Sequence, residues 1–217
     1  ALASPADQPV KQALVENLKR KYANIQALNL GWGTEHDSWE AILESRRPPD
    51  PKKAREDLAQ FNVRIAEEYF RVCREAIKAA APEQLYLGCR FDFHFYPEEA
   101  GRDWVVRVAA KYCDVISFNR YRFSTRDLTP PSGVDKPLII GEFHFGALDR
   151  GLFHTGLRSV GDQKQRAEMY VSYVRGGLEN PFVVGTHWFQ YGDQALTGRG
   201  DGENYQIGFI DVCDSPY

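Results

Sequence analysis

Four short apolar segments in the second half of the chain constrain its fold more than any other feature. Each is rich in β-branched or aromatic residues and has the length of a buried strand. They cover residues 85–93, 114–121, 137–143 and 182–189. Helical spacing of apolar residues appears between strands at 100–112 and 162–178, whereas 122–136 is polar and Pro-rich. Strands that alternate with helices predict an α/β fold with a parallel sheet covered on both faces.

The first part of the chain is predicted to be helical instead. Residues 9–23 and 52–81 carry apolar side chains at helical spacing. A further short helix is expected to begin near Trp39, with Asp37 or Ser38 as its cap.

We expect one domain over residues 1–217, made of a helical region at 1–81 and four strand–helix units at 82–217. A closed (β/α)8 barrel needs eight strands and about 250 residues, and an open flavodoxin-like sheet usually has about five strands. Four strands therefore fit half of a TIM-type barrel with an added N-terminal helical region.

Composition excludes several classes of protein. Of the 217 residues, 43% are hydrophobic, which is ample for a packed core. The net charge is −3 with acids and bases interspersed, so no basic stripe indicates nucleic-acid binding. No apolar run reaches the ~18 residues of a membrane span, and ALASPADQPV lacks the basic and apolar regions of a signal peptide. The four cysteines have no metal-type spacing and are expected to be buried free thiols, which leaves the cellular compartment open.

Polar and aromatic residues stand at or just after the carboxyl ends of all four predicted strands. In parallel α/β folds the carboxyl ends of the strands meet at one edge of the sheet, where functional residues collect. Four such ends together favour a functional site over separate structural ion pairs. These residues are Arg90, Asp92 and His94; Asn119, Arg120 and Tyr121; Glu142 and His144; and His187, Trp188 and Gln190.

Glu142 is the most informative of these residues because it leaves an apolar strand, PLIIGEF. An unpaired buried carboxylate is costly, so Glu142 either faces a wet cleft or pairs with Arg90 or Arg120. A retaining glycosidase needs a nucleophilic carboxylate and a second carboxyl group about 5–5.5 Å away. Glu142 suits the first role, with Tyr121 to orient it and Trp188 as an apolar platform for a sugar ring.

Longer stretches of the sequence carry a family resemblance. GEFHFGALDRG and GTHWFQYGDQALTGRGDGENYQIGF resemble the C-terminal half of the catalytic barrel of the β-agarase family. ALNLGWGTEHDSWEAI and DVISFNRY are similar to it as well, so the resemblance spans nearly the whole chain. That family belongs to retaining clan A of the glycoside hydrolases, which also holds many β-galactosidases and whose members are often secreted or periplasmic. The resemblance implies hydrolysis of β-galactosidic bonds in agar-type galactans or β-galactosides, with no cofactor and no metal.

The resemblance also implies roles for individual residues. Glu142 matches the nucleophile at the end of the family's seventh strand, and Tyr121 matches the sixth-strand tyrosine beside it. Trp188 matches the eighth-strand tryptophan under the −1 sugar, and residues 198–202 match a loop near the substrate. The other residues expected to bind an oligosaccharide or polysaccharide are Asn119, Arg90, His94, His144, His187, Gln190, Asp193 and Arg199.

One part of the family's catalytic pair is missing. In this clan the acid/base glutamate ends the fourth strand, usually after an asparagine, and no Asn-Glu pair follows any strand here. The four strands therefore resemble strands five to eight. Another polypeptide supplying the first half, or a homodimer closing the barrel, would complete the fold. In a homodimer the acid would be Asp92, Glu98 or Asp193; alternatively, the half-barrel binds carbohydrate without turnover.

A metal-dependent hydrolase is the remaining alternative. His94, His144 and His187 follow three strands, and with Asp92 they would suit zinc or manganese. No HxH or HExxH spacing is present, so this alternative ranks below the glycosidase.

Overall fold

The structure of the chain, a computed structural model, describes residues 1–92 and 103–217. Its contacts divide the chain into two compact units, Ala1–Tyr69 and Phe70–Tyr217. A long helix, α4 (Arg55–Ala80), carries residues of both units. It matches the helix predicted at 52–81 to within three residues.

The first unit is helical, as predicted, and its short helices have well-defined caps. They are α1 (Pro9–Lys21), α2 (Ile25–Trp32) and α3 (Trp39–Glu44). The Asn24 side chain accepts a hydrogen bond from the Ala27 amide at 2.9 Å, and Gly33 ends α2 with a φ of 66°. Ser38 caps α3 by accepting from the Ala41 amide at 3.2 Å, so Ser38, not Asp37, starts this helix.

One buried carboxylate, Asp57, lies in the first unit. The core of this unit consists of buried apolar residues: Leu14, Val15, Leu18, Ile25, Leu28, Trp32, Ile42, Ala54 and Phe61. Asp57, at the edge of this core, accepts hydrogen bonds from Lys21 Nζ at 2.6 Å, Trp32 Nε1 at 2.7 Å and the Tyr22 hydroxyl at 2.8 Å. Burial raises the pKa of the Asp57 carboxyl, but these three hydrogen bonds outweigh burial and hold the pKa below its ordinary value.

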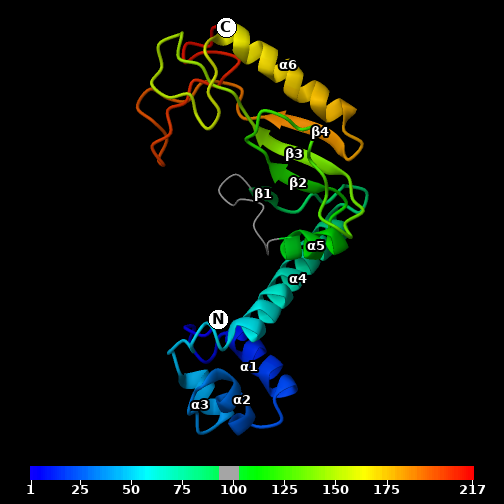
Figure 1. The fold of residues 1–217 in the computed structure, drawn as a ribbon, viewed down its shortest axis with the longest axis vertical. Coiled ribbons are helices and arrows are strands. Elements are labelled where there is room, and N and C mark those ends of the chain that lie inside the picture. The colour runs from blue at the N-terminus through cyan, green and yellow to red at the C-terminus, as the bar shows by residue number, and fades with distance from the viewer. Residues whose placement is uncertain (93–102) are drawn as a thin grey trace. The chain divides into compact units, whose positions relative to one another are not determined.

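The second unit is built on a four-stranded parallel sheet, which confirms the prediction of an α/β fold. The strands are β1 (Arg90–Asp92), β2 (Ile116–Asn119), β3 (Leu138–Phe143) and β4 (Val183–Trp188). They lie in the order β1-β2-β3-β4, and every pair is parallel (Figure 1). β1 is shorter than predicted because the chain reaches it through Gly88, whose φ of 65° is incompatible with a strand.

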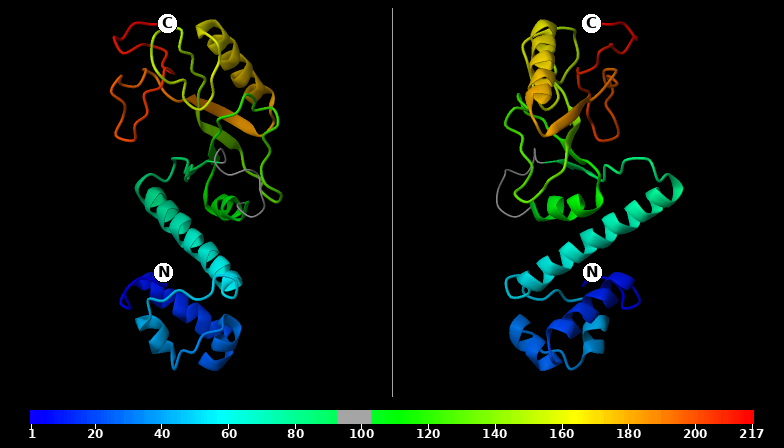
Figure 2. Two further views of the ribbon diagram at one scale, coloured as in Figure 1. Left: turned by 60° about the vertical axis from the view of Figure 1, so that its left-hand side comes forward. Right: turned by 90° about the vertical axis from the view of Figure 1, so that its right-hand side faces the viewer.

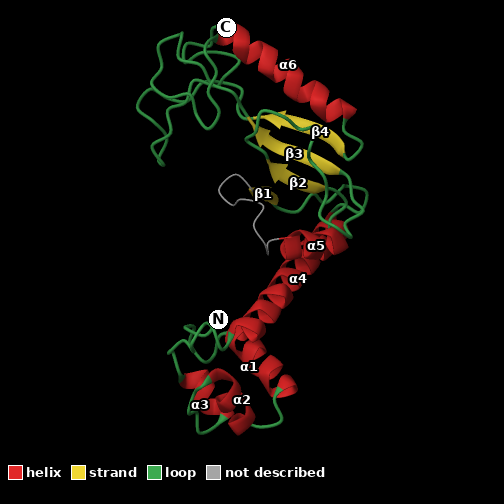
Figure 3. Ribbon diagram, in the orientation of Figure 1, coloured by secondary structure: helices red, strands yellow, loops and turns green. Residues whose placement is uncertain are grey.

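Two helices belong to the second unit. They are α5 (Asp103–Tyr112) and α6 (Gln163–Glu179). Asp162 caps α6 by accepting from the Gln165 amide at 2.7 Å. The Phe143 ring of β3 stacks on Tyr173 of α6 with centroids 4.0 Å apart, so α6 covers one face of β3. Residues 122–136 form no helix, as their polar composition predicts (Figure 3).

Long loops follow β3 and β4 and lie together at one end of the sheet (Figure 2). The Gln206 amide donates to the His154 carbonyl at 2.8 Å, and the Gly146 amide donates to the Arg158 carbonyl at 2.8 Å. The first bond fastens the loop after β4 to the loop after β3, and the second bond joins two parts of the loop after β3.

The sheet is open in the part of the chain that the structure describes. β1 and β4 each have a neighbouring strand on one side only. None of the helices in the described ranges is both long and apolar enough to span a membrane. No disulfide joins the four cysteines; Cys113 is buried as expected, whereas Cys73 and Cys89 are only partly buried and Cys213 is exposed, contrary to the expectation of burial.

Candidate active site at the carboxyl ends of the strands

The structure brings three of the predicted strand-end residues into one row. Asp92 is the register partner of Asn119, and Asn119 is the register partner of Glu142. A register irregularity between Phe118 and Asn119 precedes the Asn119–Glu142 pair. The sequence argument from parallel strand ends thus predicted correctly that these residues of β1, β2 and β3 are neighbours across the sheet.

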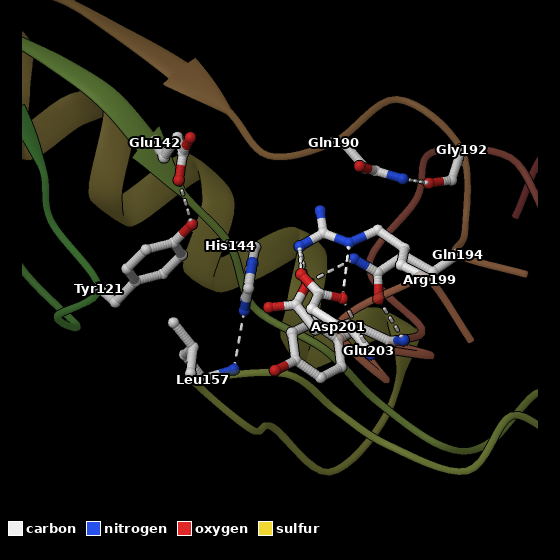
Figure 4. Close-up of polar contacts among 11 residues, drawn as sticks. Tyr121, Glu142, His144, Leu157, Gln190, Gly192, Gln194, Arg199, Asp201 and Glu203 are labelled. Atoms are coloured by element: carbon white, nitrogen blue, oxygen red, sulfur yellow. Dashed lines mark hydrogen bonds and ion pairs between the residues drawn. The ribbon is translucent and has the colours of Figure 1, made fainter. Parts of the chain in front are cut away.

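Glu142 and Tyr121 are in direct contact. The Tyr121 hydroxyl donates to Glu142 Oε2 at 2.7 Å, and the tyrosine is buried (Figure 4). Burial, and then the hydrogen bond to Glu142, raise the pKa of the Tyr121 phenol. The hydroxyl therefore stays protonated and remains a donor to the carboxylate.

Arg90 contacts the other oxygen of the same carboxylate. Its guanidinium lies 2.8 Å from Glu142 Oε1, so the ion pair considered from the sequence is present. The pair is not sealed, because the Arg90 side chain is 54% exposed and that of Glu142 is 15% exposed. Arg120 takes no part, since its guanidinium binds Asp127 at 2.8 Å. Glu142 thus has an oriented carboxylate with a solvent-accessible edge.

Trp188 lies on the opposite face of the sheet from Glu142. It is the register partner of Phe143, and its ring packs against Tyr170 of α6 at 5.4 Å and against Phe209 at 5.3 Å. The indole nitrogen donates to the Ile207 carbonyl at 2.9 Å. This orientation gives no support to the predicted sugar platform. The sequence pattern predicted strand β4 correctly, but it did not predict the face of the sheet to which Trp188 points. That face depends on two register shifts between β3 and β4.

Phe189, the residue after Trp188, lies on the side of His144. Its ring centroid is 6.1 Å from the imidazole, and the Arg199 guanidinium lies over it at 5.7 Å. Sequence analysis missed Phe189 because it follows directly after a more conspicuous tryptophan.

The loop at 198–205 is held by a network of polar contacts (Figure 4). Arg199 contacts Asp201 and lies 2.8 Å from Glu203 Oε2. The Gln194 side chain donates to the same Glu203 oxygen at 2.8 Å and accepts from the Tyr205 amide at 2.8 Å. Arg199 was predicted; Gln194 and Glu203 were not, because a long loop has no periodicity to indicate which side chains meet.

Asp193 has a different environment from the one predicted. One of its oxygens accepts from the Gly208 amide at 2.7 Å, and the other accepts from the Tyr217 hydroxyl. Both oxygens are thus occupied in fastening the C-terminal segment, which leaves Asp193 poorly suited to bind a saccharide or donate a proton.

The other predicted residues are scattered. His187 is exposed on β4, and Gln190 donates to the Gly192 carbonyl at 3.2 Å within its own turn. His144 is buried. His94 and Glu98 lie outside the described residues. Within the described ranges, no three or more His, Cys, Asp or Glu side chains are grouped to hold a metal ion.

Comparison with known proteins gives homologues along the whole chain. No protein-family model matches it. It is 41% identical to beta-agarase B of Vibrio sp. (strain JT0107) over 216 residues, which are 96% of this chain and 22% of that protein. It is 38% identical to beta-agarase A of the same strain over 220 residues, again 96% of this chain and 22% of that protein.

Solved structures that are similar to this chain are also those of agarases. An agarase, AgWH50C, matches with a TM-score of 0.86 and 42% identity, covering 100% of this chain and 31% of that chain. An exo-beta-agarase matches with a TM-score of 0.85 and 41% identity, and the match covers 100% of this chain and 30% of that chain. The chain therefore spans about a fifth of the curated relatives that it matches, and its homologues are beta-agarases.

Proposed function

We propose that the chain carries the nucleophilic half of a retaining glycoside hydrolase that cleaves β-galactosidic bonds in agar-type galactans. The observation that carries this proposal is the Glu142 carboxylate, oriented by the Tyr121 hydroxyl at 2.7 Å at the end of a buried parallel strand. The names of the homologues support the substrate class.

In this mechanism Glu142 attacks the anomeric carbon and forms a glycosyl-enzyme, while the glycosidic oxygen leaves with a proton. Water then hydrolyses the ester and regenerates the carboxylate. Tyr121 holds one oxygen of Glu142 in place, and the Arg90 guanidinium contacts the other oxygen. No cofactor is needed for either step.

The proton donor is proposed to come from outside this chain, because the acid/base glutamate implied by the family resemblance is missing from it. Glu203 is engaged by Arg199 and Gln194, and both oxygens of Asp193 are bonded within the C-terminal segment. Neither carboxyl group is therefore available to protonate a leaving oxygen. A second polypeptide that supplies the first half of a (β/α)8 barrel would complete the catalytic pair.

A labelling experiment separates the nucleophile from the missing acid. A 2,4-dinitrophenyl 2-deoxy-2-fluoro-β-galactoside has a leaving group that needs no protonation, and its fluorine slows hydrolysis of the glycosyl-enzyme. We expect one covalent sugar per chain, which peptide mass spectrometry assigns to Glu142. Binding to agarose with no label at Glu142 would instead favour the inactive carbohydrate-binding alternative.

A homodimer is the second candidate assembly, and the open edges of the sheet favour it. β1 and β4 each lack a second strand neighbour in the described ranges, and exposed edges accept strands from another chain. If two copies close an eight-stranded barrel by two-fold symmetry, light scattering will give twice the mass of 24.7 kDa. A monomer at all concentrations would contradict this assembly.

A further inference from the structure

His144 is almost completely buried beside the proposed nucleophile. The side chain follows Glu142 by two residues and is 1% exposed, so it has no free surface for a bound sugar. Its Nε2 atom accepts a hydrogen bond from the Leu157 amide at 2.8 Å (Figure 4). An imidazole nitrogen that accepts is unprotonated, so in the neutral ring the proton is on Nδ1.

The His144 ring also packs against three aromatic side chains, one from the segment after β2 and two from the segment after β4. The centroid of Tyr121, which follows β2, is 4.7 Å away. Tyr205 lies edge-on at 5.8 Å, and Phe189 lies at 6.1 Å. The imidazole is therefore the point at which the segments after β2, β3 and β4 meet.

Gly156 allows the loop to approach the imidazole this closely. Its φ is +74°, and a Cβ atom at this position would lie 2.4 Å from His144 Nε2. Only glycine leaves room for the ring beneath the loop. Gly151, in the same loop, has a φ of +97° but no atom within 4 Å of a corresponding Cβ, so it serves as a matched control.

We propose that His144 is a positioning residue, which joins the loop at Gly156 and Leu157 to the Tyr121 ring and thereby holds the Tyr121 hydroxyl on Glu142. This inference rests on the proposed role of Glu142 as nucleophile. In this proposal His144 acts on Glu142 through Tyr121. The earlier expectation that His144 binds the saccharide is replaced by this role.

Two substitutions separate the hydrogen bond from the ring packing. His144→Phe keeps a ring against Tyr121 but loses the acceptor, whereas His144→Gln restores an acceptor oxygen near the position of Nε2. For His144→Phe we expect about tenfold faster exchange of the Leu157 amide and about tenfold slower labelling of Glu142, the scale of one lost hydrogen bond. His144→Gln should bring both the exchange rate of the Leu157 amide and the labelling rate of Glu142 most of the way back to those of the unaltered chain. In NMR of 13Cζ-labelled tyrosine, the Tyr121 signal, assigned with Tyr121→Phe, should move with His144→Phe.

The glycine pair tests the same inference without changing the histidine. Gly156→Ala should displace the imidazole, slow the labelling of Glu142 about tenfold and move the Tyr121 signal. Gly151→Ala strains the backbone similarly and should have none of these three effects. Equal effects of the two substitutions would overturn the proposal. Faster Leu157 exchange with unchanged Tyr121 signal and unchanged labelling would also overturn it, because that result indicates a purely structural role.

The two proposals can fail separately. If the unaltered chain takes no label but His144→Phe and Gly156→Ala still move the Tyr121 signal, the positioning role stands and the nucleophile assignment fails. If Glu142 is labelled and neither variant changes the rate or the signal, the positioning role fails alone.

Discussion

Replacing Glu142 with glutamine should lower the rate of 2,4-dinitrophenyl β-galactoside cleavage by about a thousandfold or more, the scale seen when a covalent enzyme loses its nucleophile. Glutamine has nearly the same size and still accepts from the Tyr121 hydroxyl, but its neutral amide cannot form the glycosyl ester. Because the Arg90 side chain is half exposed, losing its ion pair should change stability by less than about 1 kcal/mol. Steady-state kinetics and thermal unfolding measure the two effects.

Asp193→Asn is the control for this experiment. Asp193 also follows a strand and was predicted for the same site, but its oxygens bind Gly208 and Tyr217. This substitution should lower stability and leave the rate per folded molecule unchanged. Similar loss of activity in the two variants, or a Glu142→Gln rate close to that of the unaltered chain, would contradict the assignment of the nucleophile.

Asp57→Ala should produce the largest loss of stability in the first unit, about 3 kcal/mol. The alanine leaves the indole N–H of Trp32 buried without its 2.7 Å acceptor and removes one acceptor from each of Lys21 and Tyr22. Urea unfolding, monitored by the hydrogen exchange of the backbone amides of residues 1–69, measures this change. A loss below about 1 kcal/mol would mean that the network around Asp57 contributes little.

Glu56→Ala is the matched control, because Glu56 is the adjacent carboxylate and also contacts Lys21, at 3.5 Å, but is 76% exposed. Its loss should cost less than about 0.5 kcal/mol. The pKa of Asp57 is held below its ordinary value, so its contribution is present above that ordinary value and declines as the pH falls through the lowered pKa. The first unit should therefore become less stable in acid, and Asp57→Ala should lose this part of the pH dependence.

The sequence predicted the sheet well because its signals are local. Apolar runs at 114–121 and 137–143 contain β2 and β3, and the helical spacing at 162–178 matches α6 to within one residue. The contact between Tyr121 and Glu142 also agrees with the sequence, since Tyr121 follows β2 and Glu142 lies near the end of the neighbouring parallel strand β3. In contrast, α2 was not predicted as a separate helix, because Gly31 within it weakens the helical pattern.

The parts of the site that the sequence did not predict depend on contacts between distant loops. Leu157 meets His144, and Gln194 meets Glu203, through turns that no periodicity indicates. The direction of Trp188 likewise depends on register shifts between β3 and β4, and one shifted residue exchanges the faces of the strand.

The parallel order of the sheet has a consequence for handling the protein. β1 and β4 are different edges, so β4 of one molecule can extend its sheet with β1 of the next, in head-to-tail fashion. Such a contact closes into a ring only when the rotation between copies divides a full turn; any other rotation yields a growing filament. If the contact does not close, a preparation held at high concentration is expected to gain turbidity through ordered polymerisation of intact molecules.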